Sequence, residues 1–389
     1  MTPCRRAPAG RRILTTLSLV VLTAGVGLLS ACGSGSTRIA AERPLNTPRA
    51  ATNLAIDYQA AADLGYVVSW DSAIRPTSGQ RISTATLMGD LLVIGQEPEN
   101  RVIGLDSATG EVKWASVIGD RREVLFPPVR EGGRVYFGSD VRVYVLDADT
   151  GDRVEVYDLD FTATTTPVPM PRGAAVGTLN GLVVAYNLAG GFPNWRYQLP
   201  QGIDARPLVT DQNVFVADRA GNYVMLEART GDPVWRNRTF GPVLAAPALS
   251  GSEVLVPSMD HTLYALNRVS GLDTWVFRAD RPLTESPFVT GQTVLVPLPG
   301  KGLQALDAFG GDKLWFLDRP DARPAATSVS GNRLVFYEPG RLIEVGLADG
   351  QVVAEGPTAA LHTVLDAGRG QLVLVGARGQ VARLRPIEP

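Results

Sequence analysis

The stretch APALSGSEVLVPSMDHTLYALNRVSGLDTWVF, residues 246–277, contains four short apolar runs separated by turn-forming residues. The runs are Ala246–Leu249, Glu253–Pro257, His261–Leu266 and Thr274–Phe277. No window of about 12 residues in the stretch has the spacing of an amphipathic helix. Short runs bounded by Gly, Ser, Pro and Asn are typical of β-strands. The stretch therefore predicts a meander of four antiparallel strands.

The same pattern recurs along the chain with a period of 40 residues. A tryptophan recurs in the fourth run, and a glycine stands four residues before it, as at Gly271 and Trp275. Glycine accepts the left-handed backbone of a tight turn, and a large aromatic ring on an outer strand can pack against the next unit. We therefore interpret the repeat tryptophans as structural; they are Trp70, Trp114, Trp195, Trp235, Trp275 and Trp315.

The two ends of the repeat array are complementary. Tyr66–Trp70 has the character of an outer strand with no inner strands before it, whereas Gln371–Val375 and Gln380–Arg385 have no outer strand after them. If the two ends complete one unit, the array closes into a ring that leaves no open sheet at its ends. Eight positions share the tryptophan frame, two of them occupied by Glu155 and Ala354. The sequence therefore predicts an all-β fold, an eight-bladed β-propeller of four-stranded antiparallel blades, spanning residues 64–389.

Composition excludes several classes of function. The chain has 389 residues, with 37 Lys and Arg against 39 Asp and Glu, so its charge carries no signature of nucleic-acid binding. Two His and two Cys are too few for an ordinary zinc site or a disulfide framework. The glycine pairs have no helix after them, and no GxSxG turn is present, so phosphate loops and serine hydrolase chemistry are not indicated. We expect no catalytic residues, no metal and no cofactor.

The N-terminus has the layout of an export signal. Four arginines precede an uncharged apolar run at Ile13–Leu29, and Leu29-Ser30-Ala31-Cys32 follows. This tetrapeptide resembles the lipobox of bacterial lipoproteins, which implies cleavage before Cys32 and lipidation of its thiol. The alternatives are an ordinary secretory signal with an incidental cysteine, or a signal anchor. We expect a signal peptide at 1–31 and a flexible tether at 32–63.

Residues that enter the innermost strands are candidates for binding, since in a propeller these strands surround a central channel. Arg206, Glu285 and Arg323 stand at or near such positions. They could recognise a polar ligand or the exposed strand of a partner. The alternative is that they pair across neighbouring blades as solvated ions, which are common and contribute little.

The run Leu263-Tyr264-Ala265-Leu266-Asn267, with Gly271 and Trp275, resembles the repeat of pyrroloquinoline-quinone-type propellers. This repeat class includes quinoprotein alcohol dehydrogenases and the BamB lipoproteins of the outer-membrane β-barrel assembly machinery. The dehydrogenases carry adjacent cysteines over the quinone, which this chain lacks. The lipobox, short tether and single propeller are similar to the BamB arrangement instead.

The resemblance implies a non-enzymatic envelope lipoprotein, monomeric, that acts as a protein-interaction scaffold. Its implied partners are an envelope protein complex, the β-barrel assembly machinery, and the membrane through the lipid anchor. Gly33 is not the Asp that favours inner-membrane retention in proteobacterial lipoproteins, so the implied location is the outer membrane, facing the periplasm. A small-molecule or glycan sensor is the alternative, followed by a quinone-dependent oxidoreductase.

Overall fold

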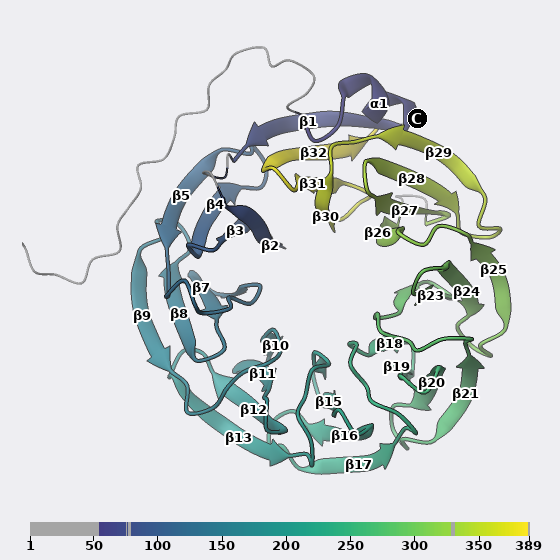
Figure 1. Ribbon diagram of the computed structural model, residues 1–389. Coiled ribbons are helices and arrows are strands. Elements are labelled where there is room, and N and C mark those ends of the chain that lie inside the picture. Colours follow the sequence, from purple (N-terminus) through teal and green to yellow (C-terminus); the bar gives the residue numbers. More distant parts are fainter. Residues whose placement is uncertain (1–53, 75, 77–78, 328–330, 388–389) are drawn as a thin grey trace, which may run out of the picture. The chain divides into compact units, whose positions relative to one another are not determined.

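The computed structural model describes residues 54–74, 76, 79–327 and 331–387. Their strands form eight antiparallel sheets of four strands each, arranged in a ring (Figure 1). The prediction of an all-β, eight-bladed propeller is confirmed. Among the described residues, no helix is long and apolar enough to cross a membrane.

The blades are numbered here in chain order, and each runs from an inner to an outer strand. Blade 1 consists of β2 (Arg81–Met88), β3 (Leu91–Glu97), β4 (Arg101–Asp106) and β5 (Val112–Val117), and blade 2 of β6 (Val129–Glu131), β7 (Arg134–Gly138), β8 (Arg142–Asp147) and β9 (Arg153–Asp158). Blade 3 consists of β10 (Val168–Met170), β11 (Gly173–Gly177), β12 (Leu182–Asn187) and β13 (Phe192–Gln198), and blade 4 of β14 (Leu208–Val209), β15 (Asn213–Ala217), β16 (Asn222–Glu227) and β17 (Pro233–Arg238).

Blades 5 to 7 follow the same order. Blade 5 consists of β18 (Ala248–Ser250), β19 (Glu253–Pro257), β20 (Thr262–Asn267) and β21 (Asp273–Arg278). Blade 6 consists of β22 (Phe288–Thr290), β23 (Thr293–Leu298), β24 (Gly302–Asp307) and β25 (Lys313–Leu317). Blade 7 consists of β26 (Arg323–Thr327), β27 (Arg333–Glu338), β28 (Arg341–Gly346) and β29 (Val352–Pro357). Blade 8 combines β30 (Leu361–Asp366), β31 (Leu372–Gly376) and β32 (Gln380–Pro386) with β1 (Tyr66–Ala73).

The middle strands are apolar on both faces because each blade is packed between two others. In β15, Val214, Phe215, Val216 and Ala217 are all at most 1% exposed. Val214 and Val216 belong to a core cluster shared with blade 3, whereas Phe215 and Ala217 belong to a cluster shared with blade 5. The hydrophobic core is therefore divided into separate layers between the blades, and side-chain alternation directs each residue to one layer or the other.

The turn before each outer strand explains the recurring glycine. In blade 5, the Asn267 side chain accepts hydrogen bonds from the backbone N–H groups of Val269 and Ser270, both at 3.0 Å. Gly271 then takes a φ of +70°, which a residue with a Cβ rarely adopts. Thr274 is an extra residue in the pairing of β20 with β21, since Leu266 pairs with Asp273 and Ala265 with Trp275. Such a bulge re-aims the side chain beside it.

Each repeat tryptophan packs on the glycine turn of the following blade. A Cβ added at Gly231 would lie 2.7 Å from the Trp195 ring, so only glycine allows this approach. The Trp195 indole N–H donates to the Ala228 carbonyl oxygen in the same turn at 2.9 Å. The interpretation of the tryptophans as packing residues agrees with these contacts. The same hydrogen bond, at 2.8 to 3.1 Å, is made by Trp70, Trp114, Trp235, Trp275 and Trp315.

The two blades without a tryptophan contact the next blade in different ways. In blade 2, the ring of Tyr157, two residues after Glu155, lies against Gly191 of blade 3. Its hydroxyl donates to the Glu155 carboxylate at 2.7 Å and lies 3.3 Å from the Ala189 carbonyl oxygen. In blade 7, Ala354 has no glycine turn to meet, because the outer strand of blade 8 comes from the other end of the chain.

Ring closure joins β1 to β32 in antiparallel register, with Tyr66 opposite Pro386 and Ala73 opposite Gln380 (Figure 1). Before β1, a short helix, α1 (Tyr58–Asp63), begins after Asp57, whose carboxylate accepts from the Gln59 backbone N–H at 2.9 Å. This helix contacts β29 of blade 7 as well as β1. It therefore covers the place where the glycine turn is missing.

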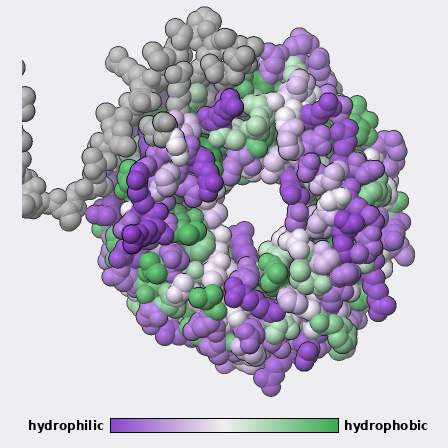
Figure 2. All heavy atoms as spheres, viewed as in Figure 1, coloured by the Kyte–Doolittle hydropathy of each residue, from purple (hydrophilic) through white to green (hydrophobic). Residues whose placement is uncertain are grey.

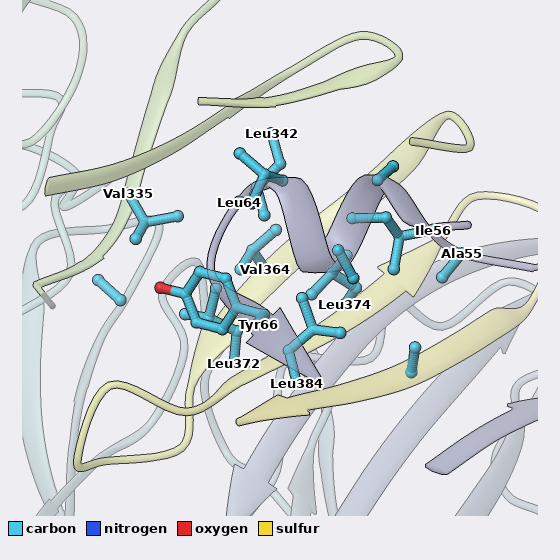
Figure 3. Packing of buried hydrophobic residues seen from close by; sticks show 14 residues of the cluster. Ala55, Ile56, Leu64, Tyr66, Val335, Leu342, Val364, Leu372, Leu374 and Leu384 are labelled. Atoms are coloured by element: carbon cyan, nitrogen blue, oxygen red, sulfur yellow. The ribbon is translucent and has the colours of Figure 1, made fainter. Parts of the chain in front are cut away.

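The packed chain begins earlier than residue 64, the start expected from the sequence. Ala55 and Ile56 are 1% and 2% exposed, and Ile56 forms a β-bridge with Thr358. Figure 3 shows Ile56 and Leu64 facing Leu374, Leu384 and other apolar side chains of blades 7 and 8. The segment predicted as the tether, 32–63, thus contains residues of the propeller from 54 onward. The expected signal peptide and the rest of the tether lie outside the described residues.

We expect Trp114→Ala to lower the free energy of unfolding by roughly 3 to 5 kcal/mol, as for other large-to-small core changes. Trp114 is 2% exposed, and its loss leaves a cavity between blades 1 and 2 and an unpaired Ala148 carbonyl group. Urea unfolding measures the change. Arg121→Ala is the control, because Arg121 forms only a surface ion pair with Glu99 and its side chain is 67% exposed. Equal losses in the two variants would contradict the role assigned to the tryptophan.

We expect Ile56→Ala to cost about 2 to 4 kcal/mol, because the removed atoms are buried in the closing blade. The matched change Gln59→Ala, on the exposed side of α1, should cost less than about 0.5 kcal/mol. Thermal and urea unfolding of both variants provide the measurement. A neutral Ile56→Ala would mean that the segment before β1 does not contribute to closure.

Candidate functional site

The inner strands surround a central opening, which Figure 2 shows from the same side as Figure 1. A pocket of about 690 Å³ lies along the inner strands of blades 1 to 3 and the entry to blade 4. We call it the Arg206 pocket, and the residues used below are Thr86, Met88, Arg130, Thr166, Pro167 and Arg206. Because four blades supply these residues, the packing between blades sets the shape of the pocket.

Arg206 lies in the connection from β13 to β14, directly before the repeating Pro207. Within the described part of the chain, its guanidinium has no hydrogen bond or ion pair. Surrounding protein partly desolvates the group and lowers its pKa from the ordinary arginine value, although the side chain still reaches solvent. It therefore remains a cation with free donors.

Glu285 and Arg323 are brought together by the ring. Arg323, the first residue of β26, donates from Nη1 to the Glu285 carboxylate at 2.7 Å, across the junction of blades 6 and 7. The two side chains are 31% and 45% exposed, which is typical of a surface pair of small energetic value. The three candidates expected to form one channel-mouth site are thus one ion pair and one separate arginine.

A second polar cluster, which sequence analysis did not identify, surrounds Glu123 in the connection between blades 1 and 2. Its carboxylate accepts from the Tyr144 hydroxyl at 2.7 Å, the Ser139 hydroxyl at 2.9 Å and Arg142 Nη1 at 2.8 Å. Burial alone would raise the pKa of Glu123, but these hydrogen bonds and the Arg142 charge outweigh burial and lower it below 4.5. Since its charges and donors are mutually satisfied, we interpret the cluster as structural.

An open cleft of about 520 Å³ lies beside this cluster. Arg121, Arg142 and Arg153 line it together with Tyr144. Arg121 pairs with Glu99, and Arg142 pairs with both Glu123 and Asp158. Acidic partners thus already take up much of the positive charge, and the cleft has less capacity for an added anion than the Arg206 pocket.

Groups for catalysis or metal binding do not converge in the described residues. No cluster of three or more His, Cys, Asp or Glu side chains there could hold a metal ion. Cys4 and Cys32 both lie outside the described residues, and they are 28 positions apart, so adjacent cysteines of the quinone-binding kind are not encoded. The residues present therefore do not fit a pyrroloquinoline quinone site of that type.

Sequence reasoning located Arg206 but missed the rest of its pocket. The repeating prolines mark the entry to each inner strand, yet they do not reveal which entries face a common space. Tyr157 was also missed, although an aromatic residue two positions after Glu155 lies on the same face of a strand and could have been found. The Glu123 cluster carries no local signal, because its members come from the connection between blades 1 and 2, the turn between β7 and β8, and β8.

Comparisons with known proteins agree on the fold. A family model described as "Outer membrane protein assembly factor BamB" matches residues 65–201, 141–239, 179–285 and 247–382. No curated protein matches the sequence.

Solved structures of three proteins share the architecture at low identity. BamB from Moraxella catarrhalis has a TM-score of 0.65 at 18% identity, covering 81% of this chain and 96% of its own. The computationally designed Ika8 protein has a TM-score of 0.64 at 15% identity, covering 78% and 96%. The C-terminal WD40 domain of Sif2 has a TM-score of 0.63 at 10% identity, covering 83% and 99%. Likeness at this identity concerns the fold alone.

We expect Glu123→Gln to destabilise the protein by roughly 2 to 3 kcal/mol at pH 7, because charge-assisted hydrogen bonds to a buried carboxylate are lost. The pKa of Glu123 is lower in the folded than in the unfolded chain, so its contribution is complete above pH 4.5 and declines as the pH falls through the folded value. The difference between the variant and the original protein should therefore shrink in acid. Urea unfolding at several pH values tests this.

The matched control is Glu111→Gln, which changes an exposed carboxylate with no side-chain hydrogen bond among the described residues. Its effect should be below about 0.5 kcal/mol at pH 7. A pH-independent loss in Glu123→Gln would show that the carboxylate is not stabilised in its charged form.

Proposed function

Because the chain belongs to the family described as outer membrane protein assembly factor BamB, we propose that it is a non-enzymatic envelope lipoprotein that acts as a protein-interaction scaffold in the assembly of outer-membrane β-barrel proteins. The observation that carries this proposal is the extent of the family match. The matched segments together span 65–382, which includes strands of all eight blades. The match therefore concerns the whole ring rather than one common repeat.

The rigidity of the ring supports a scaffold role. Each blade is buried on both faces, and closure places the two ends of the folded chain in one sheet. Loops and outer strands are thus held at fixed positions around a stable frame, which reduces the entropy lost when a partner binds. This property suits a protein whose task is to position other proteins.

Exposed apolar side chains on blades 5 and 6 supply a surface for such a partner. Val269 and Leu272 in blade 5 are 77% and 66% exposed, and Phe309 in blade 6 is 73% exposed. The two turns are held side by side, because Trp275 of blade 5 packs on Gly311 next to Phe309. Neighbouring exposed apolar groups of this kind favour protein contact. We propose that a β-barrel assembly subunit docks here.

Membrane attachment belongs to the same proposal. Cys32 would be the acylated first residue of the mature protein, and Gly33 after it favours the outer membrane, with the propeller in the periplasm. More than one acyl chain holds a protein at a bilayer far more firmly than one chain does. The anchor would keep the propeller close to partners embedded in the same membrane.

A quinone-dependent oxidoreductase is the weaker candidate, since the adjacent cysteines of that group are not encoded. It predicts dye reduction that requires both calcium and the quinone. A sensor of small molecules is favoured by one specific observation: Arg206, in its pocket, has no partner among the described residues.

The proposal is tested by crosslinking the full-length protein in native membranes and identifying the captured proteins by mass spectrometry. We expect β-barrel assembly subunits, and Phe309→Asp should reduce their capture at least fivefold, because a charge in an apolar interface must be desolvated. Phe192→Asp is the matched control, since Phe192 is an exposed aromatic residue, 52% exposed, on blade 3, which does not neighbour blades 5 and 6.

The anchor is tested separately with Cys32→Ser, for which Cys4→Ser is the matched control. Only Cys32→Ser should lose labelling by a radioactive fatty acid and leave the membrane fraction. Capture of a different envelope complex by the acylated protein would overturn the assembly role, and equal labelling of both variants would overturn the anchor.

A further inference from the structure

The Arg206 pocket has the composition of an anion site. The charged side chains that line it are Arg130 and Arg206, and no Asp or Glu from the described residues joins them. With about 690 Å³, it has the volume of a site for a small molecule or a short peptide segment. A concave surface with one sign of charge concentrates ions of the opposite sign.

The two arginines differ in how many hydrogen bonds and ion pairs they already form with protein groups. Arg130 donates to the carbonyl oxygens of Met88 and Gly132, at 3.2 and 3.4 Å, and pairs with Asp90 just outside the pocket. Arg206 has no partner among the described residues, and surrounding protein removes part of its hydration. A partly desolvated guanidinium without a partner gains more from an incoming anion than one that is already paired.

Other lining residues add donors and an apolar wall. The half-buried hydroxyls of Thr86 and Thr166 have no hydrogen-bond partner in the described part of the chain, so both are available to an anion. Met88 and Pro167 present apolar surface in the same pocket. The lining thus combines donors for a charged group with a surface for an apolar one.

We propose that this pocket binds a ligand that carries a carboxylate next to an apolar group, with Arg206 as the main carboxylate-binding residue. The planar guanidinium offers two parallel N–H donors that match the two carboxylate oxygens. Thr86 and Thr166 supply further donors, and Met88 and Pro167 contact the apolar part. The carboxylate can belong to a small organic acid or to an acidic side chain of an extended peptide.

This site is independent of the scaffold role. The pocket lies on the inner strands of blades 1 to 3 and the entry to blade 4, whereas the proposed partner surface lies on outer turns of blades 5 and 6. Loss of one can therefore be measured without loss of the other.

The test is titration of the full-length protein, in mild detergent, with benzoate and with neutral benzamide, followed by ligand-observed NMR. Benzoate should bind saturably with a Kd of about 10 mM or tighter, and benzamide at least about tenfold more weakly. Arg206→Gln should weaken benzoate binding at least about tenfold, and added salt should weaken binding to the original protein. Arg323→Gln is the matched control and should leave the Kd within about twofold, because Arg323 lies outside the pocket.

A second titration identifies the source of the carboxylate. A blocked tripeptide with a central Asp is compared with its Asn counterpart: binding of the Asp peptide tighter than benzoate indicates a peptide ligand, and weaker binding indicates a small organic acid. Either result is consistent with carboxylate binding in the Arg206 pocket.

The proposal is overturned if benzoate does not saturate the original protein, if benzamide binds equally well, or if Arg206→Gln and Arg323→Gln bind benzoate alike. Unchanged thermal unfolding shows that Arg206→Gln remains folded. Should that variant unfold, Thr166→Val replaces it and is expected to weaken benzoate binding about threefold; an unchanged Kd would then overturn the proposal.

Discussion

The contact between an outer-strand aromatic ring and the glycine turn of the next blade is the interaction on which the whole ring depends. An isolated four-stranded blade would expose two apolar faces, so it is stable only between neighbours. The indole N–H of each repeat tryptophan also donates to a carbonyl oxygen of that turn, as between Trp195 and Ala228. Packing and hydrogen bonding together define the rotation from one blade to the next, and repetition of that rotation closes the ring.

Ring closure leaves the junction of blades 7 and 8 without a glycine turn for an aromatic ring to pack on. Blade 8 is assembled from both ends of the chain, so no turn precedes its outer strand. The segment around α1 compensates by packing Ile56, Leu64 and neighbouring residues against blades 7 and 8. Ala354 stands where the other blades have a large aromatic, and its small side chain belongs to that same cluster. The missing tryptophan is thus a consequence of where the chain begins and ends within the ring.

The ring also separates two surfaces with different chemistry. The outer turns of blades 5 and 6 present apolar side chains such as Phe309 to solvent, whereas the entry to the inner strand of blade 4 carries Arg206, a cation with no partner among the described residues. Neither surface exists within a single blade, because each combines residues of adjacent units. A propeller can therefore bind a protein at its rim and a smaller group at its centre without altering the frame that carries both.

The sequence by itself determined the repeat, the number of blades, the strand that closes the ring and the recurring tryptophan position. These features depend on local strand length, turn residues and a fixed period, all of which are visible along the chain. Tertiary structure alone decided that Ala55 and Ile56 belong to the propeller and that Tyr157 replaces a tryptophan. It also decided that Glu285 pairs with Arg323, whereas Arg206 has no partner in the part of the chain that the structure describes. Those outcomes depend on distances between residues of different blades, which the curvature of the closed ring sets and no local pattern encodes.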